Sequence, residues 1–227
     1  MILSLETSTS VCSLALHQEG LCLAEQVYNL PKSHATLMPE VIRQLLDNLN
    51  VQRSALEAIA ISDGPGSYTG LRIGTATGKG LCSALDIPLI SVNSLDIMIE
   101  EMRPIVADIS YIAPMIDARR MEVYMKLIDK KGSELKDTRA VILTPDLFDN
   151  YIEYPILLVG DGARKWEGFI DHPHLKIVPD IYPRAQCMGI LAFQKFKEGS
   201  FENLQDFEPN YLKEFHTMPS KNPLGNL

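Results

Sequence analysis

Asp63-Gly-Pro-Gly-Ser-Tyr-Thr-Gly-Leu-Arg-Ile-Gly-Thr-Ala-Thr-Gly-Lys-Gly80 is the stretch that most constrains the fold of this chain. It follows a strand-like apolar run over 58–62 and predicts a helix over 67–85, with Ser67 as the N-cap. A glycine inside a helix costs roughly 1 kcal/mol relative to alanine, so the glycines at 70, 74, 78 and 80 together cost about 4 kcal/mol. Something must therefore require a helix surface without side chains: a phosphate, a strand packed close beneath, or another helix.

The segments around this stretch form a pattern that occurs twice along the chain. In the first copy, strands over 2–6, 11–17 and 21–28 precede a helix over 37–49 capped by Thr36, the strand and helix above, a strand over 88–92 and a helix over 94–102. In the second, strands over 111–117, 122–128 and up to 143 precede a short helix opened by Thr144-Pro145-Asp146, strands over 156–159 and 176–178, and a closing helix over 184–198. Two copies of β-β-β-α-β-α-β predict two α/β lobes of mixed sheet with helices outside, residues 1–103 and 104–227.

The composition is that of an ordinary globular protein, with 46% hydrophobic residues and a net charge of −8. This negative net charge argues against a protein that binds nucleic acid by itself. We interpret the short basic clusters Arg119-Arg120 and Lys130-Lys131 as solvated turns. No apolar run approaches the roughly 18 residues of a membrane span, and the N-terminal residues lack the pattern of a signal peptide. The four cysteines show no metal-type spacing, so we expect reduced thiols, no membrane contact and a cytoplasmic location.

The turn Asp63-Gly-Pro-Gly66, which we call the glycine turn, and the hydroxyl-rich segment Glu6-Thr-Ser-Thr-Ser10 are candidates for phosphate contact. A helix N-terminus after such a turn can hold an anion. The helix does not match a P-loop: three residues rather than four separate Gly74 and Gly78, and Gly80 stands where Ser or Thr would bind magnesium. The turn also lacks the third glycine of a dinucleotide fingerprint, and Pro65 removes an amide donor. We expect no required cofactor, and ATP stays an alternative, with contacts from Thr7, Ser8, Gly64, Gly66 and Ser67.

No residue set for catalysis or metal binding can be picked out. None of the five histidines belongs to an HxxxH or HExxH pattern, and no serine sits in a G-x-S-x-G elbow. Asp63, Asp117 and Asp161 each follow a strand, and we interpret them as capping and turn residues, although paired-carboxylate chemistry stays open on residue types alone. The sequence therefore predicts no catalytic residue and no metal.

Two helices of the first lobe carry wider apolar arcs than packing on one sheet requires. On a helical wheel the apolar residues of the helix over 37–49 cover about 180°, whereas the usual apolar stripe covers roughly 100°. In the helix predicted over 67–85, the polar side is narrow. Either the second lobe or another chain buries this surface; we favour another chain, because small residues four apart let helices approach closely. The predicted interface consists of Leu37, Met38, Val41, Ile42, Leu45, Gly70, Leu71, Gly74, Thr77, Gly78 and Leu81.

Several segments resemble the bacterial TsaB family, also called YeaZ. The similar segments run in the same order over nearly the whole chain: Ile2-Leu-Ser-Leu-Glu-Thr-Ser-Thr, His34 before Leu37-Met-Pro, Gly64-Pro-Gly-Ser-Tyr-Thr-Gly-Leu-Arg-Ile-Gly, Ile116-Asp-Ala-Arg and Pro209-Asn-Tyr-Leu-Lys213. The resemblance implies two ribonuclease-H-like lobes of the actin/Hsp70/sugar-kinase-like (ASKHA) fold. It also implies a role in making threonylcarbamoyladenosine next to the tRNA anticodon, as a partner of the related transferase TsaD, with the ATPase TsaE joining them. When alone, the chain would form a homodimer through the same N-terminal helices.

Two positions bear on what the resemblance implies. The TsaD family carries a metal-binding His-x-x-x-His after the strand that matches 88–92, where this chain has Ser94 and Met98, which serve a hard or borderline metal poorly. Glu6 stands where an aspartate is usual, which weakens the case for ATP at that loop. We therefore expect a non-catalytic subunit that binds and activates TsaD and meets tRNA only through the complex. The alternatives are an ATP-dependent small-molecule phosphotransferase and a peptidase.

Overall fold

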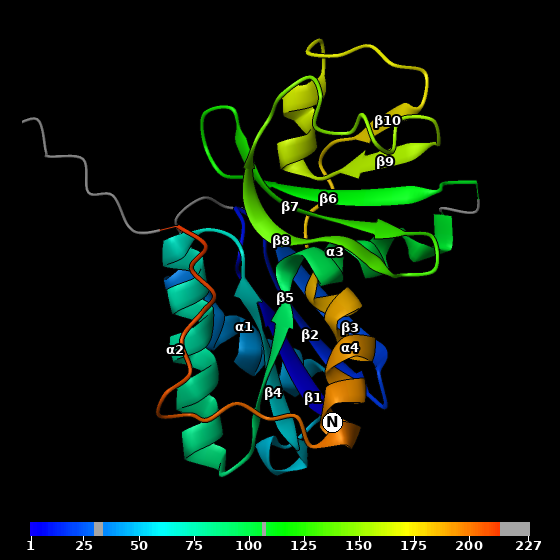
Figure 1. The fold of residues 1–227 in the computed structure, drawn as a ribbon. Helices are drawn as coiled ribbons and strands as arrows, with labels where there is room; N and C mark the ends of the chain where they lie inside the picture. The colour runs from blue at the N-terminus through cyan, green and yellow to red at the C-terminus, as the bar shows by residue number, and fades with distance from the viewer. Residues whose placement is uncertain (30–33, 106–107, 214–227) are drawn as a thin grey trace, which may run out of the picture.

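The computed structural model describes residues 1–29, 34–105 and 108–213. These residues fold into two lobes stacked one above the other, each built on a five-stranded mixed sheet (Figure 1). Residues 2–93 supply the strands of the first sheet, and residues 111–178 supply those of the second. The predicted pair of mixed-sheet lobes is therefore confirmed.

The first sheet has the strand order β3-β2-β1-β4-β5. Its first three strands are antiparallel neighbours, whereas β1, β4 and β5 run parallel to one another. Every residue of the central strand β1 is buried because helices cover both faces of the sheet, while the edge strand β3 alternates between exposed and half-buried positions. The strands are β1 Ile2–Glu6, β2 Cys12–Gln18, β3 Leu21–Tyr28, β4 Ala58–Gly64 and β5 Leu89–Asn93.

The second sheet repeats this arrangement, with the order β10-β9-β6-β7-β8. Each strand occupies the place of its counterpart in the first sheet, and the first three strands of the repeat again form an antiparallel meander. Since the order and the directions agree, the duplication read from the sequence is a duplication of structure. The strands are β6 Tyr111–Asp117, β7 Glu122–Asp129, β8 Glu134–Ile142, β9 Ile156–Val159 and β10 Leu175–Val178, and short 3₁₀ segments are η1 Arg53–Ala55, η2 Arg103–Ile105 and η3 Asp161–Trp166.

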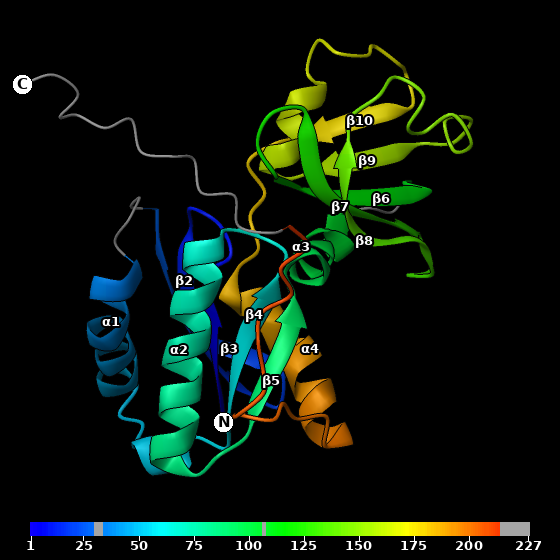
Figure 2. The same cartoon turned by 60° about the vertical axis from the view of Figure 1, so that its left-hand side comes forward.

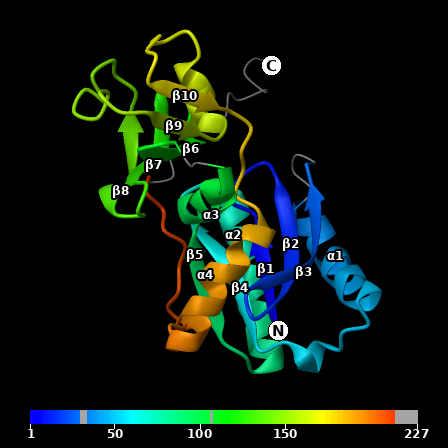
Figure 3. The same ribbon diagram turned by 90° about the vertical axis from the view of Figure 1, so that its right-hand side faces the viewer.

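Three helices enclose the first sheet. Helices α1 (His34–Asn48) and α2 (Tyr68–Leu85) lie on one face, and α4 (Ala185–Glu198) lies on the other (Figures 2 and 3). Although α4 closes the second repeat in sequence, its residues Met188 and Ala192 pack in one buried cluster with residues of β1, β4 and β5. The chain therefore returns to the first lobe after it has built the second sheet.

Helix α3 (Ser94–Met102) joins the two lobes. Its buried side chains Leu95, Met98 and Ile99 form one apolar cluster with residues of β6 and β9 in the second lobe. On the same helix, Asp96 pairs with Lys126 of β7 at 2.7 Å. Apolar packing and an ion pair thus hold the second sheet against α3.

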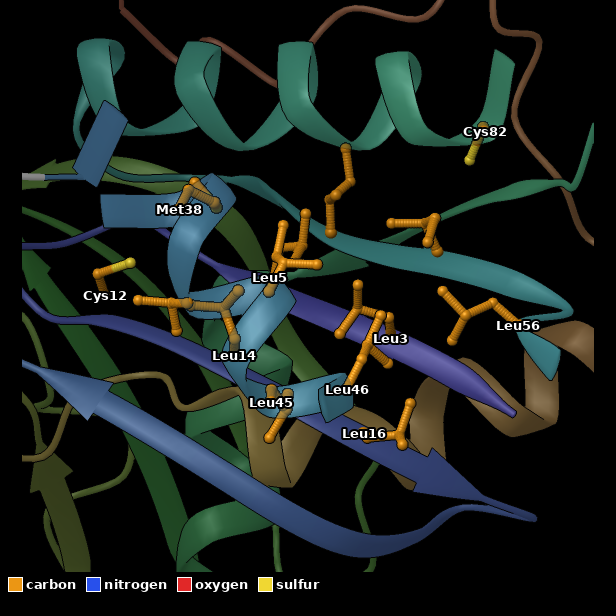
Figure 4. Close-up of a cluster of buried hydrophobic side chains, with 14 of the residues drawn as sticks. Leu3, Leu5, Cys12, Leu14, Leu16, Met38, Leu45, Leu46, Leu56 and Cys82 are labelled. Atoms are coloured by element: carbon orange, nitrogen blue, oxygen red, sulfur yellow. The ribbon is translucent and has the colours of Figure 1, made fainter. Parts of the chain in front are cut away.

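The core under α1 explains the wide apolar arc of that helix. Met38, Leu45 and Leu46 of α1 project among leucines of β1 and β2, with Cys82 of α2 bordering the same cluster (Figure 4). The arc is covered by the sheet and by α2 together, so neither burial by the second lobe nor burial by another chain is needed to explain it.

Several predicted elements have different bounds or a different form. The helix predicted over 37–49 spans His34–Asn48, so Thr36 lies inside it and is not its cap. The short helix predicted after Thr144-Pro145-Asp146 is a series of turns over 145–153. Ser67 is confirmed as the N-cap of α2, since its hydroxyl accepts a hydrogen bond from the amide of Gly70, and α3 has the predicted bounds.

Candidate functional site

Three glycines of α2, at 70, 74 and 78, face the chain's own first sheet; we call them the glycine stripe. A Cβ atom added at Gly70 would lie 2.0 Å from the carbonyl oxygen of Thr7, and one at Gly74 would lie 2.4 Å from the Thr7 hydroxyl. A Cβ at Gly78 would lie 2.8 Å from Ile61 of β4. Among the three explanations for this stripe, close packing on the segment beneath is correct, and it includes the loop after β1 as well as the strand.

The predicted interface is therefore wrong for most of its residues. Met38, Val41, Ile42, Leu45 and Leu71 are at most 8% exposed because they fill the core between the helices and the sheet. The glycines at 70, 74 and 78 are buried as well, for the steric reason above. The remaining three residues, Leu37, Thr77 and Leu81, are half-buried.

A different side of α2 faces away from the sheet. We define the outward face of α2 as the exposed or half-buried uncharged residues on the flank between the glycines at 70, 74 and 78 and the exposed Arg72: Thr69, Ile73, Ala76, Thr77, Gly80 and Ala84. A Cβ added at Gly80 would meet nothing within 4 Å, unlike the other helical glycines. The sequence already contains this face as a second row of small residues, which is displaced around the helix from the row of glycines at 70, 74 and 78. Five of these six residues are small, whereas Arg72 and Ser83 occupy exposed positions next to them on the same helix.

The loop after β1 is clamped onto the N-terminus of α2. The Ser67 amide donates to the Ser8 carbonyl at 2.6 Å, and the Thr7 hydroxyl donates to the Gly70 carbonyl at 2.8 Å. A Cβ at Gly66 would lie 2.2 Å from the Ser8 carbonyl oxygen, so the chain itself already fills the space that this glycine leaves. The five candidate phosphate residues are thus gathered in one place. Phosphate contact there stays a prediction.

Glu6 lies fully buried at the end of β1, beside this loop. Its Oε1 accepts a hydrogen bond from the Ser8 amide at 2.6 Å, and its Oε2 has no hydrogen-bond partner among the described residues. Burial raises the pKa of Glu6 to about 7, and burial also raises the pKa of Asp63, on β4, to about 6. The loop therefore contains a carboxyl group that can hold a proton near neutral pH.

The cleft between the lobes is closed by residues 207–213, which we call the C-terminal strap; in Figure 1 it runs beside α2. The Asn210 amide donates to the Asp63 carbonyl at 2.7 Å, and the ring of Tyr211 lies 4.7 Å from that of Tyr68. Lys213 reaches the second lobe, where its ammonium donates to the Ala118 carbonyl at 3.0 Å and pairs with Glu122.

The strap leaves little space in this cleft. A hollow of about 30 Å³ is lined by the glycine turn, two tyrosines and the strap itself: Gly66, Tyr68, Leu71, Tyr124, Asn210, Tyr211, Leu212 and Lys213. That volume suits about one water molecule. The sequence singled out Pro209–Lys213 as similar to a family, but no local pattern indicated that this segment bridges the lobes.

The positions that would hold metal ligands in a TsaD-type chain are used for packing. Ser94 and Met98 are both fully buried, and a Cβ added at Gly160 of the second lobe would lie 2.5 Å from the Met98 methyl group. Within residues 1–29, 34–105 and 108–213, no three His, Cys, Asp or Glu side chains are grouped as metal ligands. At this place the chain offers an apolar contact between lobes instead of a ligand pair.

Two of the three aspartates expected in turns act there, whereas Asp63 lies within β4 and its Oδ1 has no hydrogen-bond partner among the described residues. Asp161 accepts a hydrogen bond from the Asp117 amide at 2.9 Å, and Asp117 in turn accepts from the Arg119 amide at 2.5 Å. Asp117 also pairs with Lys165 at 2.6 Å. The turn-forming role expected for Asp117 and Asp161 is therefore confirmed.

No helix in the described part of the chain has the length and apolar character needed to cross a membrane.

Two sheets of equal strand order, with helices packed around them, define the actin/Hsp70/sugar-kinase-like class of α/β proteins. The activator of the 2-hydroxyisocaproyl-CoA dehydratase from Clostridium difficile shares this fold, with a TM-score of 0.50 at 11% identity over 88% of this chain and 97% of that chain. YeaZ from Pseudomonas aeruginosa is much more similar, with a TM-score of 0.79 at 30% identity over 93% of this chain and 99% of that chain.

Sequence comparison narrows this class to one family. The family model for tRNA N6-adenosine threonylcarbamoyltransferase, TsaD, matches residues 23–165. The tRNA threonylcarbamoyladenosine biosynthesis protein TsaB of Haemophilus influenzae is 31% identical over 93% of both chains, and that of Escherichia coli is 28% identical over 93% of this chain and 94% of its own. A transferase of Cytophaga hutchinsonii matches only 41% of this chain and 32% of its own, at 31% identity. The chain belongs to the TsaB (YeaZ) family of tRNA threonylcarbamoyladenosine biosynthesis proteins.

Proposed function

We propose that this chain is a non-catalytic subunit of the complex that makes threonylcarbamoyladenosine in tRNA, and that it binds a TsaD-type transferase and keeps it active. The observation that carries the proposal is the outward face of α2, an uncharged row of small residues along an exposed helix. Small residues at this spacing let the backbones of two helices approach closely, so a helix of the transferase fits the face.

Two features of the cleft support a role without catalysis. Ser94 and Met98 stand where the transferase family has its metal ligands, and Met98 packs against the second lobe. The glycine turn that would face a phosphate is filled by the Ser8 carbonyl, whose partial negative charge opposes an anion. The chain therefore contributes to the reaction by contact with the transferase.

The same face serves a homodimer in this proposal. Because one surface then has two uses, the transferase and a second copy of this chain compete for it. TsaE joins the complex of the two chains, and tRNA is modified only by the assembled complex.

Substitution on the outward face tests the proposal. Ala76→Arg and Gly80→Arg place a charged side chain on the exposed side of α2, where the fold does not restrict it. Neither variant should lower the melting temperature, and Gly80→Arg should raise it because arginine has a higher helix propensity than glycine. Both should lose co-purification with the cognate transferase and fail to support tRNA threonylcarbamoylation in a reconstituted assay. Ile190→Arg is the matched control, since Ile190 is 59% exposed on α4, on the opposite side of the sheet. Wild-type co-purification of both α2 variants would overturn the proposal.

A further inference from the structure

The tip of the β6–β7 hairpin presents two adjacent arginines, Arg119 and Arg120. Both are exposed, and neither guanidinium group has a hydrogen bond or an ion pair within the described residues. The chain as a whole carries a net charge of −8. Two uncompensated positive charges therefore lie next to each other at one turn of an acidic protein.

The neighbouring carboxylates do not neutralise this pair. Asp117 is paired with Lys165 at 2.6 Å, and Glu122 is paired with Lys213 of the C-terminal strap. Both acidic groups at the tip of the hairpin thus already have a lysine partner. The hairpin tip keeps a surplus of two positive charges that is free for an anionic ligand.

The backbone of the turn holds both arginines in an uncommon conformation. Arg119 and Arg120 have φ angles of 70° and 49°, a region that residues other than glycine rarely adopt. Hydrogen bonds fix it: Asp117 accepts from the Arg119 amide at 2.5 Å, and the Glu122 amide donates to the Arg119 carbonyl at 3.2 Å. The base of each side chain is therefore positioned before any ligand arrives, which lowers the entropic cost of binding.

We infer that Arg119 and Arg120 bind phosphate oxygens of the RNA backbone when tRNA is held by the assembled complex. This inference rests on the proposed function, because the complex must bring the tRNA to this chain. Guanidinium groups match phosphate oxygens in a fork geometry. An RNA backbone fits better than an acidic protein surface, since protein interfaces centre on apolar anchors and Met121 alone is a large exposed apolar residue in this turn.

The acidic surface elsewhere limits the strength of this contact. A chain with a net charge of −8 repels nucleic acid over most of its surface, so two arginines do not hold tRNA without the partner. The contact instead orients a tRNA that the complex already binds.

The salt dependence of tRNA binding tests this inference. The full-length double variant Arg119→Gln/Arg120→Gln is assembled with the transferase, and its affinity for tRNA is measured by filter binding at several KCl concentrations. Loss of two phosphate contacts should make the slope of log K against log [KCl] shallower by about one to two. The matched control is Lys130→Gln/Lys131→Gln, two adjacent exposed cations at the next hairpin of the same lobe.

Assembly with the transferase, measured without tRNA, separates this inference from the proposed function. A shallower slope for the arginine variant alone, with assembly intact, supports the inference. A wild-type slope overturns it, and so does an equal change in the lysine control. Loss of assembly by the arginine variant would assign the arginines to the protein partner and also overturn it. If the wild-type chain itself does not assemble, the proposed function fails instead.

Discussion

The pair Gly70→Ala and Gly80→Ala separates the packing role of the α2 glycines from their helix propensity. At Gly80 the new methyl group meets nothing within 4 Å, so the variant gains only the propensity difference of about 1 kcal/mol. At Gly70 the methyl carbon would lie 2.0 Å from the Thr7 carbonyl oxygen, a backbone atom that cannot rotate away. Overpacking of this kind costs roughly 1–3 kcal/mol, and the upper end applies here, so the net loss is about 2 kcal/mol.

Thermal unfolding measures the two effects directly. For a chain of this size, 1 kcal/mol shifts the melting temperature by roughly 2–4 °C. Gly80→Ala should raise it by about 2–4 °C, and Gly70→Ala should lower it by about 4–8 °C. Both variants are measured at two protein concentrations, because association through the outward face of α2 would also raise the melting temperature. Shifts of the same sign at both positions, at each concentration, would refute the reasoning.

Three other parts of the molecule give expected outcomes. Burial raises the pKa of Glu6 from 4.5 to about 7, so its neutral form contributes stability that is present below pH 4.5 and lost as the pH rises through 7. Glu6→Gln should reduce the fall in the free energy of unfolding between pH 4.5 and pH 7, measured by urea titration. An unchanged dependence of this free energy on pH would contradict the prediction. Tyr211→Ala removes the ring packed against Tyr68, so hydrogen exchange should quicken in the turn over 64–67 while α1 keeps its protection; unchanged exchange in that turn would count against the strap. Lys126→Met leaves Asp96 39% exposed and solvated, so the unfolding free energy should change by less than about 1 kcal/mol. A loss above roughly 3 kcal/mol would mean that the pair behaves as a buried ion pair.

Local signals in the sequence predicted most elements of the fold. Ser67 and the apolar run over 58–62 predicted the positions of α2 and β4, and Pro104 predicted the end of α3. The turns over 145–153 were mistaken for a helix because Thr144-Pro145 resembles a helix start. In the structure, Phe148 is buried against Trp166 in the second core, at a ring distance of 5.4 Å, and the backbone follows it in separate turns.

The arrangement of layers was harder to predict than the elements. An apolar arc shows that a helix side is covered, but it does not show which segment covers it. Leu45 and Met38 are buried by strands and by α2 because both helices lie on the same face of one sheet. The glycine stripe was equally ambiguous, since close approach to Thr7 requires the same residue type as close approach to another helix. The outward face and the C-terminal strap depend on such long-range placement.

The position of α4 has a consequence for how the protein is made. The face of the first sheet that carries Ile2, Ala60 and Ile90 is covered by residues 185–198, so it stays uncovered while the ribosome synthesises the second lobe. At roughly 5–20 residues per second, the interval between Asn93 and Ala185 lasts on the order of 5–20 s. During that time a finished sheet exposes an apolar face. The nascent chain is then a natural substrate for a chaperone that binds apolar strands and leaves when α4 arrives.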